Sequence, residues 1–260
     1  MSQGFLETLF GLSGQVAVVT GGTGVLGGAL ARGLAQAGAK VVVAGRSEER
    51  GLACVGEIER LGGAASFLPV DVDRRESIES LLAAALDMHG RVDMLVNGAG
   101  VNSASPYLEV TDENWEFVLR SNLTSVHWGC QVFGKAMAAA GGGSILNIAS
   151  VTAHTPLSKV FAYSASKAAV VSLTQNVARE LAPHKVRVNA LCPGFFPAEQ
   201  NRKLLDAQRT ASIMSQTPMA RFGEPDELVG AAILLLSRRA GSFITGASYY
   251  VDGGFTAMRF

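Results

Sequence analysis

The stretch Val16-Ala-Val-Val-Thr-Gly-Gly-Thr-Gly-Val-Leu-Gly27 decides the fold of this 260-residue chain. Its first five residues are apolar or β-branched, which is typical of a strand that is covered on both faces. Glycines follow at positions 21, 24 and 27, and a helical pattern begins near residue 26. Glycines in this place allow a tight turn and let a pyrophosphate approach free N–H groups at the positive end of the helix. Because glycines also serve ordinary turns, the loop favours dinucleotide binding without establishing it.

Apolar segments of strand length alternate with longer helical patterns along the whole chain. The expected strands cover residues 16–20, 41–44, 66–70, 94–96, 144–149, 186–191 and 248–251. The expected helices cover residues 26–37, 48–61, 75–89, 112–139, 159–182 and 225–238. This alternation predicts a single doubly wound, Rossmann-type α/β domain over residues 1–260, with a parallel seven-stranded sheet and helices on both faces. In such a fold ligands bind at the carboxyl ends of the strands.

Composition and charge exclude several classes of protein. Apolar residues make up 48% of the chain and charged residues only 17%, and this composition excludes an intrinsically disordered protein. The 22 Lys and Arg residues balance 22 Asp and Glu residues, which excludes the overall positive charge of a nucleic-acid binder. We therefore expect a small-molecule substrate and no nucleic-acid partner.

No segment of the sequence indicates a membrane span, an export signal or a metal site. The longest apolar run, residues 228–236, is far shorter than the roughly 20 residues that cross a bilayer as a helix. The first basic residue is Arg32, so a secretory signal does not fit the N-terminus. Cys54, Cys130 and Cys192 lie far apart and are expected to be small buried side chains. We expect a cytoplasmic protein that binds neither a membrane nor a metal.

The residues that follow the second expected strand bear on which dinucleotide binds. An acidic side chain at this point would bind the hydroxyls of the adenosine ribose. Here the position is Gly45, and Arg46 follows it. Because a guanidinium suits a 2′-phosphate, we expect NADP(H) to be preferred, with NAD(H) possible. The alternative is that Arg46 is a solvated side chain at the end of a strand.

Three polar residues after the fifth expected strand suggest proton-transfer chemistry. Ser150 ends that strand, and Tyr163 and Lys167 lie on one face of the next helix because they are four residues apart. An ammonium beside a phenol favours the phenolate, so we expect Lys167 to lower the pKa of Tyr163. Tyr163 could then exchange a proton with a substrate oxygen that Ser150 polarises. A Tyr-x-x-x-Lys pair alone is common and is often ordinary helix surface.

From about residue 14 to 254 the chain resembles the short-chain dehydrogenase/reductase family. The motifs that carry the resemblance are the glycine loop, Asp71-Val72, Asn97-Gly-Ala-Gly100, Asn122, Ser150, Tyr163 with Lys167, Pro193-Gly194 and Thr245-Gly246 with Val251-Asp-Gly-Gly254. The resemblance implies an NAD(P)-dependent oxidoreductase that acts on a secondary alcohol or ketone. It also implies a homotetramer, for which the helix at 159–182 and the last strand offer candidate contacts, unless both pack within the monomer.

The resemblance further implies a catalytic tetrad of Asn122, Ser150, Tyr163 and Lys167. In that family Tyr donates or accepts the proton, and Ser holds the reacting oxygen. Lys binds the nicotinamide ribose and lowers the pKa of Tyr, while Asn props open its helix and anchors a water of the proton relay. A non-catalytic protein that senses the cofactor is the alternative of a different class, but such a sensor could lose Tyr163 or Lys167 without penalty.

Cofactor contacts are implied in the same way. They are Gly21, Thr23, Gly24, Leu26, Gly27, Arg46, Asp71, Val72, Asn97, Ala99, Tyr163, Lys167, Pro193, Gly194 and Phe196. Asp71 and Val72 would contact the adenine, and Asn97 has the alternative role of tying neighbouring strands together. The sequence departs from the family twice: Val25 replaces the middle Gly of the common loop, and Ala198 replaces a Thr after Pro-Gly.

The substrate loop is expected at residues 195–217. It carries five polar or charged residues in a row, Glu199 to Lys203, which suit a carboxylate or several hydroxyls and not a fatty substrate. The candidate substrate contacts are Asn102, Ser150, His154, Gln200, Asn201 and Arg202. This loop and the glycine loop resemble the fructuronate reductase and gluconate 5-dehydrogenase branch, which implies a sugar acid or polyol. A 3-oxoacyl thioester substrate is the alternative, and the loop residues could also be a solvated helix face.

Overall fold

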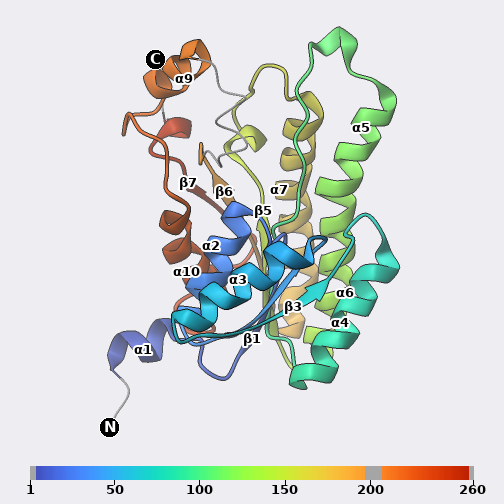
Figure 1. Cartoon of the computed structure of the whole chain (residues 1–260), viewed down its shortest axis with the longest axis vertical. Coiled ribbons are helices and arrows are strands. Elements are labelled where there is room, and N and C mark those ends of the chain that lie inside the picture. The colour runs from blue at the N-terminus through green and yellow to red at the C-terminus, as the bar shows by residue number, and fades with distance from the viewer. Residues whose placement is uncertain (1–3, 197–206, 258–260) are drawn as a thin grey trace.

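A computed structural model describes residues 4–196 and 207–257 and shows one parallel sheet with helices on both sides (Figure 1). The seven strands lie in the order β3-β2-β1-β4-β5-β6-β7. They are β1 (Val16–Thr20), β2 (Lys40–Gly45), β3 (Ala64–Pro69), β4 (Met94–Asn97), β5 (Gly143–Ile148), β6 (Val186–Pro193) and β7 (Ser248–Val251). The strand order reverses between β1 and β4, which is where the crevice of a doubly wound fold opens.

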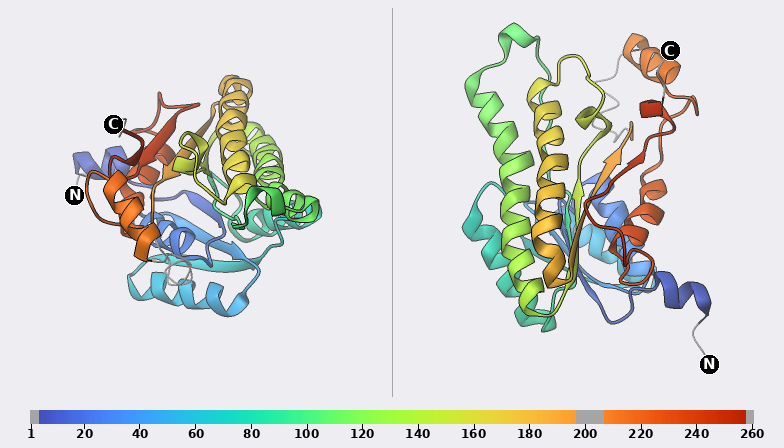
Figure 2. Two further views of the ribbon diagram at one scale, coloured as in Figure 1. Left: turned by 90° about the horizontal axis from the view of Figure 1, so that it is seen from above. Right: turned by 180° about the vertical axis from the view of Figure 1, so that it is seen from behind.

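The α-helices cover both faces of the sheet (Figure 2). They are α1 (Phe5–Phe10), α2 (Val25–Gln36), α3 (Glu48–Arg60), α4 (Arg75–His89), α5 (Asp112–Leu119), α6 (Ser125–Ala139), α7 (Phe161–Leu181), α9 (Ala207–Gln216) and α10 (Val229–Leu236). Buried side chains of α4, α6 and α7 form the core on one face, and those of α2, α3 and α10 form the core on the other. No helix in the described ranges is long and apolar enough to cross a membrane.

Successive residues of the central strands feed these two cores alternately. In β1, Val18 faces the core beneath α4, α6 and α7, whereas Ala17 and Val19 face the core beneath α2, α3 and α10. All five residues of β1 are buried. Because side chains alternate across a strand, a strand covered on both faces must be apolar throughout. The continuous apolar runs therefore predicted this sheet correctly.

The predicted elements agree with the structure except at four places. The expected helix over 112–139 is divided into α5, a π-helix over Arg120–Thr124, and α6. The α-helix within the expected range 225–238 begins later than expected, because a 3-10 turn over Pro225–Leu228 precedes α10. Helices α1 and α9 were not predicted. Helix α1 has only six residues and buries none of them, so it is too short for the repeated apolar spacing by which a sequence pattern reveals a helix.

A buried polar network joins the sheet to α7 beneath its carboxyl edge. Asn147 of β5 accepts a hydrogen bond from Asn97 Nδ2 at 2.8 Å and donates one to Thr174 Oγ1 at 2.9 Å. The Thr174 hydroxyl in turn donates to the Val170 carbonyl at 2.7 Å. Asn147 and Thr174 have no exposed surface. Because each side chain satisfies its neighbour away from water, the network fixes β4, β5 and α7 relative to one another.

We predict that Asn147→Leu destabilises the protein strongly. Leucine would leave the amide of Asn97 without its oxygen acceptor in a dry environment, at a cost on the order of 2–4 kcal/mol in the free energy of unfolding. The control is Glu59→Leu on the exposed side of α3, where a change within about 0.5 kcal/mol is expected. Urea denaturation measures both, and equal effects of the two variants would contradict the prediction.

Candidate active site

Two glycines of the loop after β1 are required by the loop itself. Gly21 has φ of +72°, and a β carbon there would lie 2.7 Å from the backbone nitrogen of Ala99. A β carbon on Gly27 would collide with the carbonyl of Gly21. These two positions close the turn and let α2 approach β1. Their glycines are therefore explained without any ligand.

Gly24 differs, because the chain does not need a glycine at this position. It is the exposed N-cap of α2, its φ is −96°, and no side chain caps the first turn. A β carbon there would come no closer than 3.3 Å to another atom, the carbonyl oxygen of Gly21. The space that a side chain would fill lies in front of the N–H groups of α2, where an anion binds best. This open cradle fits the pyrophosphate of a dinucleotide.

Thr23 occupies the place from which an acidic side chain would project at the end of β2. A β carbon on Gly45 would lie 2.6 Å from Thr23 Oγ1. The following residue, Arg46, is exposed beyond the end of β2. Thr23 thus leaves no room for an acidic side chain at position 45. The exposed guanidinium of Arg46 is the charged group that lies beside the glycine loop.

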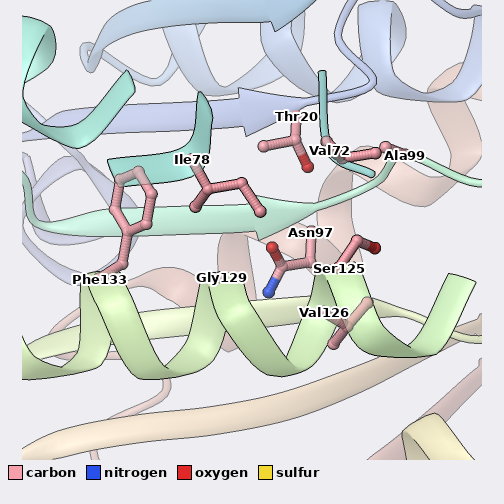
Figure 3. Close-up of a pocket in the computed structure, with 9 residues that line it drawn as sticks. All are labelled: Thr20, Val72, Ile78, Asn97, Ala99, Ser125, Val126, Gly129 and Phe133. Carbon is pink, nitrogen blue, oxygen red and sulfur yellow. The ribbon is translucent and has the colours of Figure 1, made fainter. Parts of the chain in front are cut away.

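The predicted adenine contacts lie on a fixed turn after β3. The N–H of Asp71 donates to Ser77 Oγ at 2.9 Å, and Asp71 Oδ1 accepts from the N–H of Asp73 at 3.1 Å. Val72 lines a cavity of about 10 Å³ together with Ala99 and Asn97 (Figure 3). This volume holds about one water molecule. The turn therefore brings the expected adenine contacts to the edge where the neighbouring strands β1 and β4 end.

The side chain of Asn97 points toward α6 (Figure 3) and ties β4 to β5 through Asn147. It is 5% exposed, so its second predicted role, joining strands, is the one that its contacts favour. The predicted contacts at the end of β6 also lie on this edge. Gly194 approaches Asp252 so closely that a β carbon would lie 2.7 Å from its Cα. The half-buried Phe196 packs against the core that contains α10, and the half-buried Leu26 at the start of α2 packs against the same core.

Asn122 lies in the π-helix between α5 and α6, and its side chain is fully buried. Asn122 Oδ1 accepts from the N–H of Val101 at 2.8 Å, and Nδ2 donates to the Val101 carbonyl at 2.9 Å and to Ser166 Oγ at 3.1 Å. These bonds hold the segment after β4 against α7. The widened turn places a long-range hydrogen-bonding side chain inside the protein, a common use of π-helical turns at functional sites.

Ser150 and Tyr163 form a hydrogen-bonded pair. Ser150 follows β5, is buried, and its Oγ accepts from the N–H of Thr152 at 3.2 Å. Burial raises the pKa of Tyr163 above its ordinary value, and the hydrogen bond with Ser150 opposes this shift. The expectation that Lys167 gives Tyr163 a lowered pKa is therefore wrong for this structure. Desolvation of the phenolate is the larger effect.

Lys167 is held close to Tyr163 but makes its hydrogen bond elsewhere. Its Nζ lies 5.6 Å from the centre of the Tyr163 ring and donates to the Ile148 carbonyl at 2.7 Å. The side chain is almost fully buried, and burial lowers the pKa of Lys167 to about 8, while Cys192 opposes this shift. Below that pH the ammonium is the positive charge nearest to a phenolate formed at Tyr163.

The sequence analysis predicted a buried Cys192 but did not place it beside Lys167, and it did not single out Tyr250. Cys192 at the end of β6 is fully buried, and burial raises its pKa to about 11, although the N–H of Ser150 and the hydroxyl of Tyr250 are hydrogen-bonded to it. Tyr250 of β7 also lies edge-on to His154, with ring centres 6.3 Å apart. The sequence had no signal for these contacts because β6 and β7 meet only in the folded sheet.

The predicted substrate contacts are only partly described. Asn102 and His154 are exposed at the edge that carries Ser150, beyond β4 and β5 respectively. Gln200, Asn201 and Arg202 lie outside the described residues, as does Ala198. The structure thus brings together Asn122, Ser150, Tyr163 and Lys167, while residues 197–206 of the expected substrate loop lie outside the described residues.

Comparison with known proteins agrees with this geometry. The family described as short chain dehydrogenase matches residues 15–209. The chain is 37% identical to gluconate 5-dehydrogenase of Gluconobacter oxydans over 95% of this chain and 97% of that protein. It is 33% identical to 3-oxoacyl-(acyl-carrier-protein) reductase of Chlamydia pneumoniae, over 94% and 98%. A crystal structure of gluconate 5-dehydrogenase from Burkholderia cenocepacia in complex with NADP and tartrate superposes with a TM-score of 0.93 at 34% identity, over 97% and 99%.

We predict a pH-dependent contribution of Lys167 to stability. Its pKa is about 8 when folded, against a usual 10.5, so the unfolded chain binds the proton more tightly. The contribution of Lys167 to the free energy of unfolding therefore rises with pH between these two values. Below about pH 8 this contribution does not change, because Lys167 is protonated in both the folded and the unfolded chain. Relative to Lys167→Met, the wild-type unfolding free energy should increase by roughly 2 kcal/mol between about pH 7 and pH 9.5.

Denaturant unfolding at several pH values checks this prediction. The difference between the two proteins is the readout, because buried thiols and Tyr163 titrate in both of them. The matched control is Lys135→Met on the exposed side of α6, which should shift stability equally at every pH. If the difference in unfolding free energy between wild type and Lys167→Met is the same at every pH, burial does not lower the pKa of Lys167 and the prediction is wrong.

Proposed function

Because the chain belongs to the short-chain dehydrogenase family, we propose that it is an NADP(H)-dependent oxidoreductase that interconverts a secondary alcohol and a ketone of a sugar acid or polyol. The observation that carries the proposal is the meeting of Ser150, Tyr163, Lys167 and Asn122 from three separate parts of the chain at one edge of the sheet. This arrangement can hold a carbonyl or hydroxyl oxygen and move one proton to or from it.

The dinucleotide, when bound, supplies or accepts the hydride. The residues that we propose to hold it are the glycine loop, Arg46, the turn at Asp71 and Val72, Ala99, the segment 193–196, and Tyr163 and Lys167. Gly24 leaves the N–H groups of α2 open to its pyrophosphate. Arg46 is exposed where a 2′-phosphate would lie.

Proton transfer is assigned to Tyr163. In ketone reduction its hydroxyl gives its proton to the substrate oxygen, and in alcohol oxidation the phenolate takes that proton back. Ser150 donates a hydrogen bond to the same oxygen. The raised pKa of Tyr163 keeps its proton in place near neutral pH, which suits a proton donor. The ammonium of Lys167 then stabilises the phenolate left behind, and Asn122 positions α7 through Ser166.

The sugar-acid class rests on two kinds of support. Relatives named as gluconate 5-dehydrogenase and as 2-dehydro-3-deoxy-D-gluconate 5-dehydrogenase share 37% and 36% of their residues with this chain. The polar run Glu199 to Lys203 offers Gln200, Asn201 and Arg202 as partners for a carboxylate and hydroxyls. The alternative substrate, a 3-oxoacyl thioester, is supported by a relative that is named as a 3-oxoacyl-(acyl-carrier-protein) reductase and is 33% identical to this chain. A non-catalytic sensor would have no need of the complete tetrad.

A substrate panel tests the proposal. Sugar acids, polyols and 3-oxoacyl thioesters are offered with NADPH or NADP+, and the change in absorbance of the nicotinamide is followed. We expect turnover with a sugar acid or polyol, and a loss of roughly 10²–10⁴-fold in kcat for Tyr163→Phe, with cofactor affinity retained. If only acyl thioesters are turned over, the proposed sugar-acid or polyol substrate is wrong and the thioester alternative holds. A variant that kept most of its kcat would overturn the role of Tyr163.

The cofactor preference has its own test. The triple variant Thr23→Ala, Gly45→Asp, Arg46→Ile removes the positive charge and makes room for a carboxylate beside the adenosine ribose. We expect the ratio of kcat/KM for NADPH over NADH to fall by more than about tenfold, since one charged hydrogen bond is replaced by repulsion. The variant that keeps Thr23 is the control, because its new β carbon would lie 2.6 Å from Thr23 Oγ1. An unchanged ratio in the triple variant would refute the role of Arg46.

We also propose a cytoplasmic homotetramer. Ala168 and Ser172 form a small, exposed stripe on α7, and β7 is an edge strand with an exposed Tyr249. Both surfaces can meet their own copies about two-fold axes. Three free, buried cysteines fit a reducing compartment. Light scattering should give about four times the 27.1 kDa chain mass, and Ala168→Arg should lower it. A monomer at micromolar concentration would contradict the assembly.

A further inference from the structure

A second cleft lies at the opposite edge of the sheet, among the amino ends of the strands. Its volume is about 320 Å³, and it is lined by Gln15 before β1, Arg91 before β4, and Ser237, Arg238 and Arg239 after α10. Helix α1 closes one side with Thr8 and lies beside the end of α10 (Figure 1). Small-molecule sites in proteins begin at about this volume. None of the proposed catalytic or cofactor residues lines this cleft.

The cleft holds more positive charge than its one buried carboxylate can balance. Asp93 is 3% exposed and accepts from the N–H of Val16 at 2.9 Å. It also accepts two hydrogen bonds from Arg91, at 2.9 and 2.6 Å, and a further one from Arg238. These four bonds use the lone pairs of the carboxylate. Asp93 therefore anchors two guanidiniums that retain unused N–H donors at the cleft.

Arg239 adds a third guanidinium. Across residues 4–196 and 207–257 no carboxylate lies within ion-pair distance of it, and Glu7 on α1 is not part of the cleft lining. Its backbone is fixed, because the N–H of Arg239 donates to Ser237 Oγ at 3.2 Å while that hydroxyl donates to the Leu9 carbonyl at 2.8 Å. The three arginines and Asp93 together give the cleft a net charge of two positive units. Arg238 and Arg239 lie on the turn that these hydrogen bonds fix.

Gln15 supplies an observation independent of charge. The residue is 9% exposed and lines the cleft, yet its Oε1 is buried without a hydrogen-bond partner. A buried acceptor left unpaired costs about 1–3 kcal/mol, so such atoms in native proteins usually meet a ligand or water. Because this oxygen has almost no accessible surface, a ligand hydroxyl can satisfy it only once the Gln15 amide turns toward the cleft, where anionic groups meet the arginines.

We propose that this cleft binds a small hydroxylated polyanion, such as a hydroxy-polycarboxylate or a sugar phosphate. Guanidiniums bind carboxylate and phosphate oxygens through paired N–H groups. The excess of two charges requires more than one anionic group, and Gln15 selects for a hydroxyl. The site is separate from the proposed dinucleotide site, since one lies at the amino ends and the other at the carboxyl ends of the same strands.

Isothermal titration calorimetry of the NADPH-saturated enzyme at fixed ionic strength tests the proposal. The probes are citrate, glucose 6-phosphate, inorganic phosphate and glucose. We expect citrate or glucose 6-phosphate to bind with Kd below about 1 mM, inorganic phosphate at least about tenfold more weakly, and glucose not at all. Arg239→Gln should weaken the tighter probe by about tenfold or more, and Gln15→Leu should remove the advantage over inorganic phosphate.

The matched control is Arg60→Gln at the exposed end of α3, which should leave binding unchanged. Arg239→Gln breaks no ion pair among residues 4–196 and 207–257, and its melting temperature verifies that it is folded. Three results would overturn the site: no binding of either hydroxylated anion, equal weakening by Arg60→Gln and Arg239→Gln, or equal affinity for inorganic phosphate and citrate. Turnover of sugar acids does not enter the readout, so failure here and failure of the proposed function remain distinguishable.

Discussion

The structure depends on a parallel sheet that is buried on both faces. Because all seven strands run the same way, the turns that leave them emerge at one edge. The helix after β1 passes to one face and the segment after β4 to the other, so a crevice opens between them. Gly24, Asp71, Asn122, Ser150 and Lys167 reach that crevice from five different turns or helices. Residues that are far apart in the sequence lie close together here because all the strands run in the same direction.

Desolvation then determines the chemistry of the residues gathered there. Burial raises the pKa of Tyr163 and lowers that of Lys167 to about 8, so each group is pushed toward its neutral form. The pair is therefore not a preformed phenolate and ammonium. Tyr163 holds a proton that it can give away, and Lys167 is poised to become or stay charged in response to a nearby negative charge. The network through Asn147 and Thr174 keeps this arrangement rigid.

The two ends of the sheet carry different electrostatic environments. At the carboxyl edge, backbone N–H groups of α2 and the exposed guanidinium of Arg46 lie beside the crevice. At the amino edge, three arginines line one cleft, and two of them, Arg91 and Arg238, bind the buried Asp93. The chain as a whole has no net charge, so this separation of charge is a property of the fold. Surface composition alone could not reveal it, because Arg91 and Arg238 are 147 positions apart in sequence but share one carboxylate.

Sequence by itself determined what depends on local order: the strands with continuous apolar runs, the glycine turn after β1, and the four-residue spacing of Tyr163 and Lys167. These features are set by backbone sterics and by side-chain periodicity within a few residues. Only the tertiary structure decided the rest. It placed a π-helix at Asn122, packed Thr23 against Gly45, set Cys192 beside Lys167 and Tyr250 beside Cys192, and reversed the expected pKa shift of Tyr163. Each of these depends on which distant side chains exclude water from a group, and exclusion of water is a property of packing that no short stretch of sequence encodes.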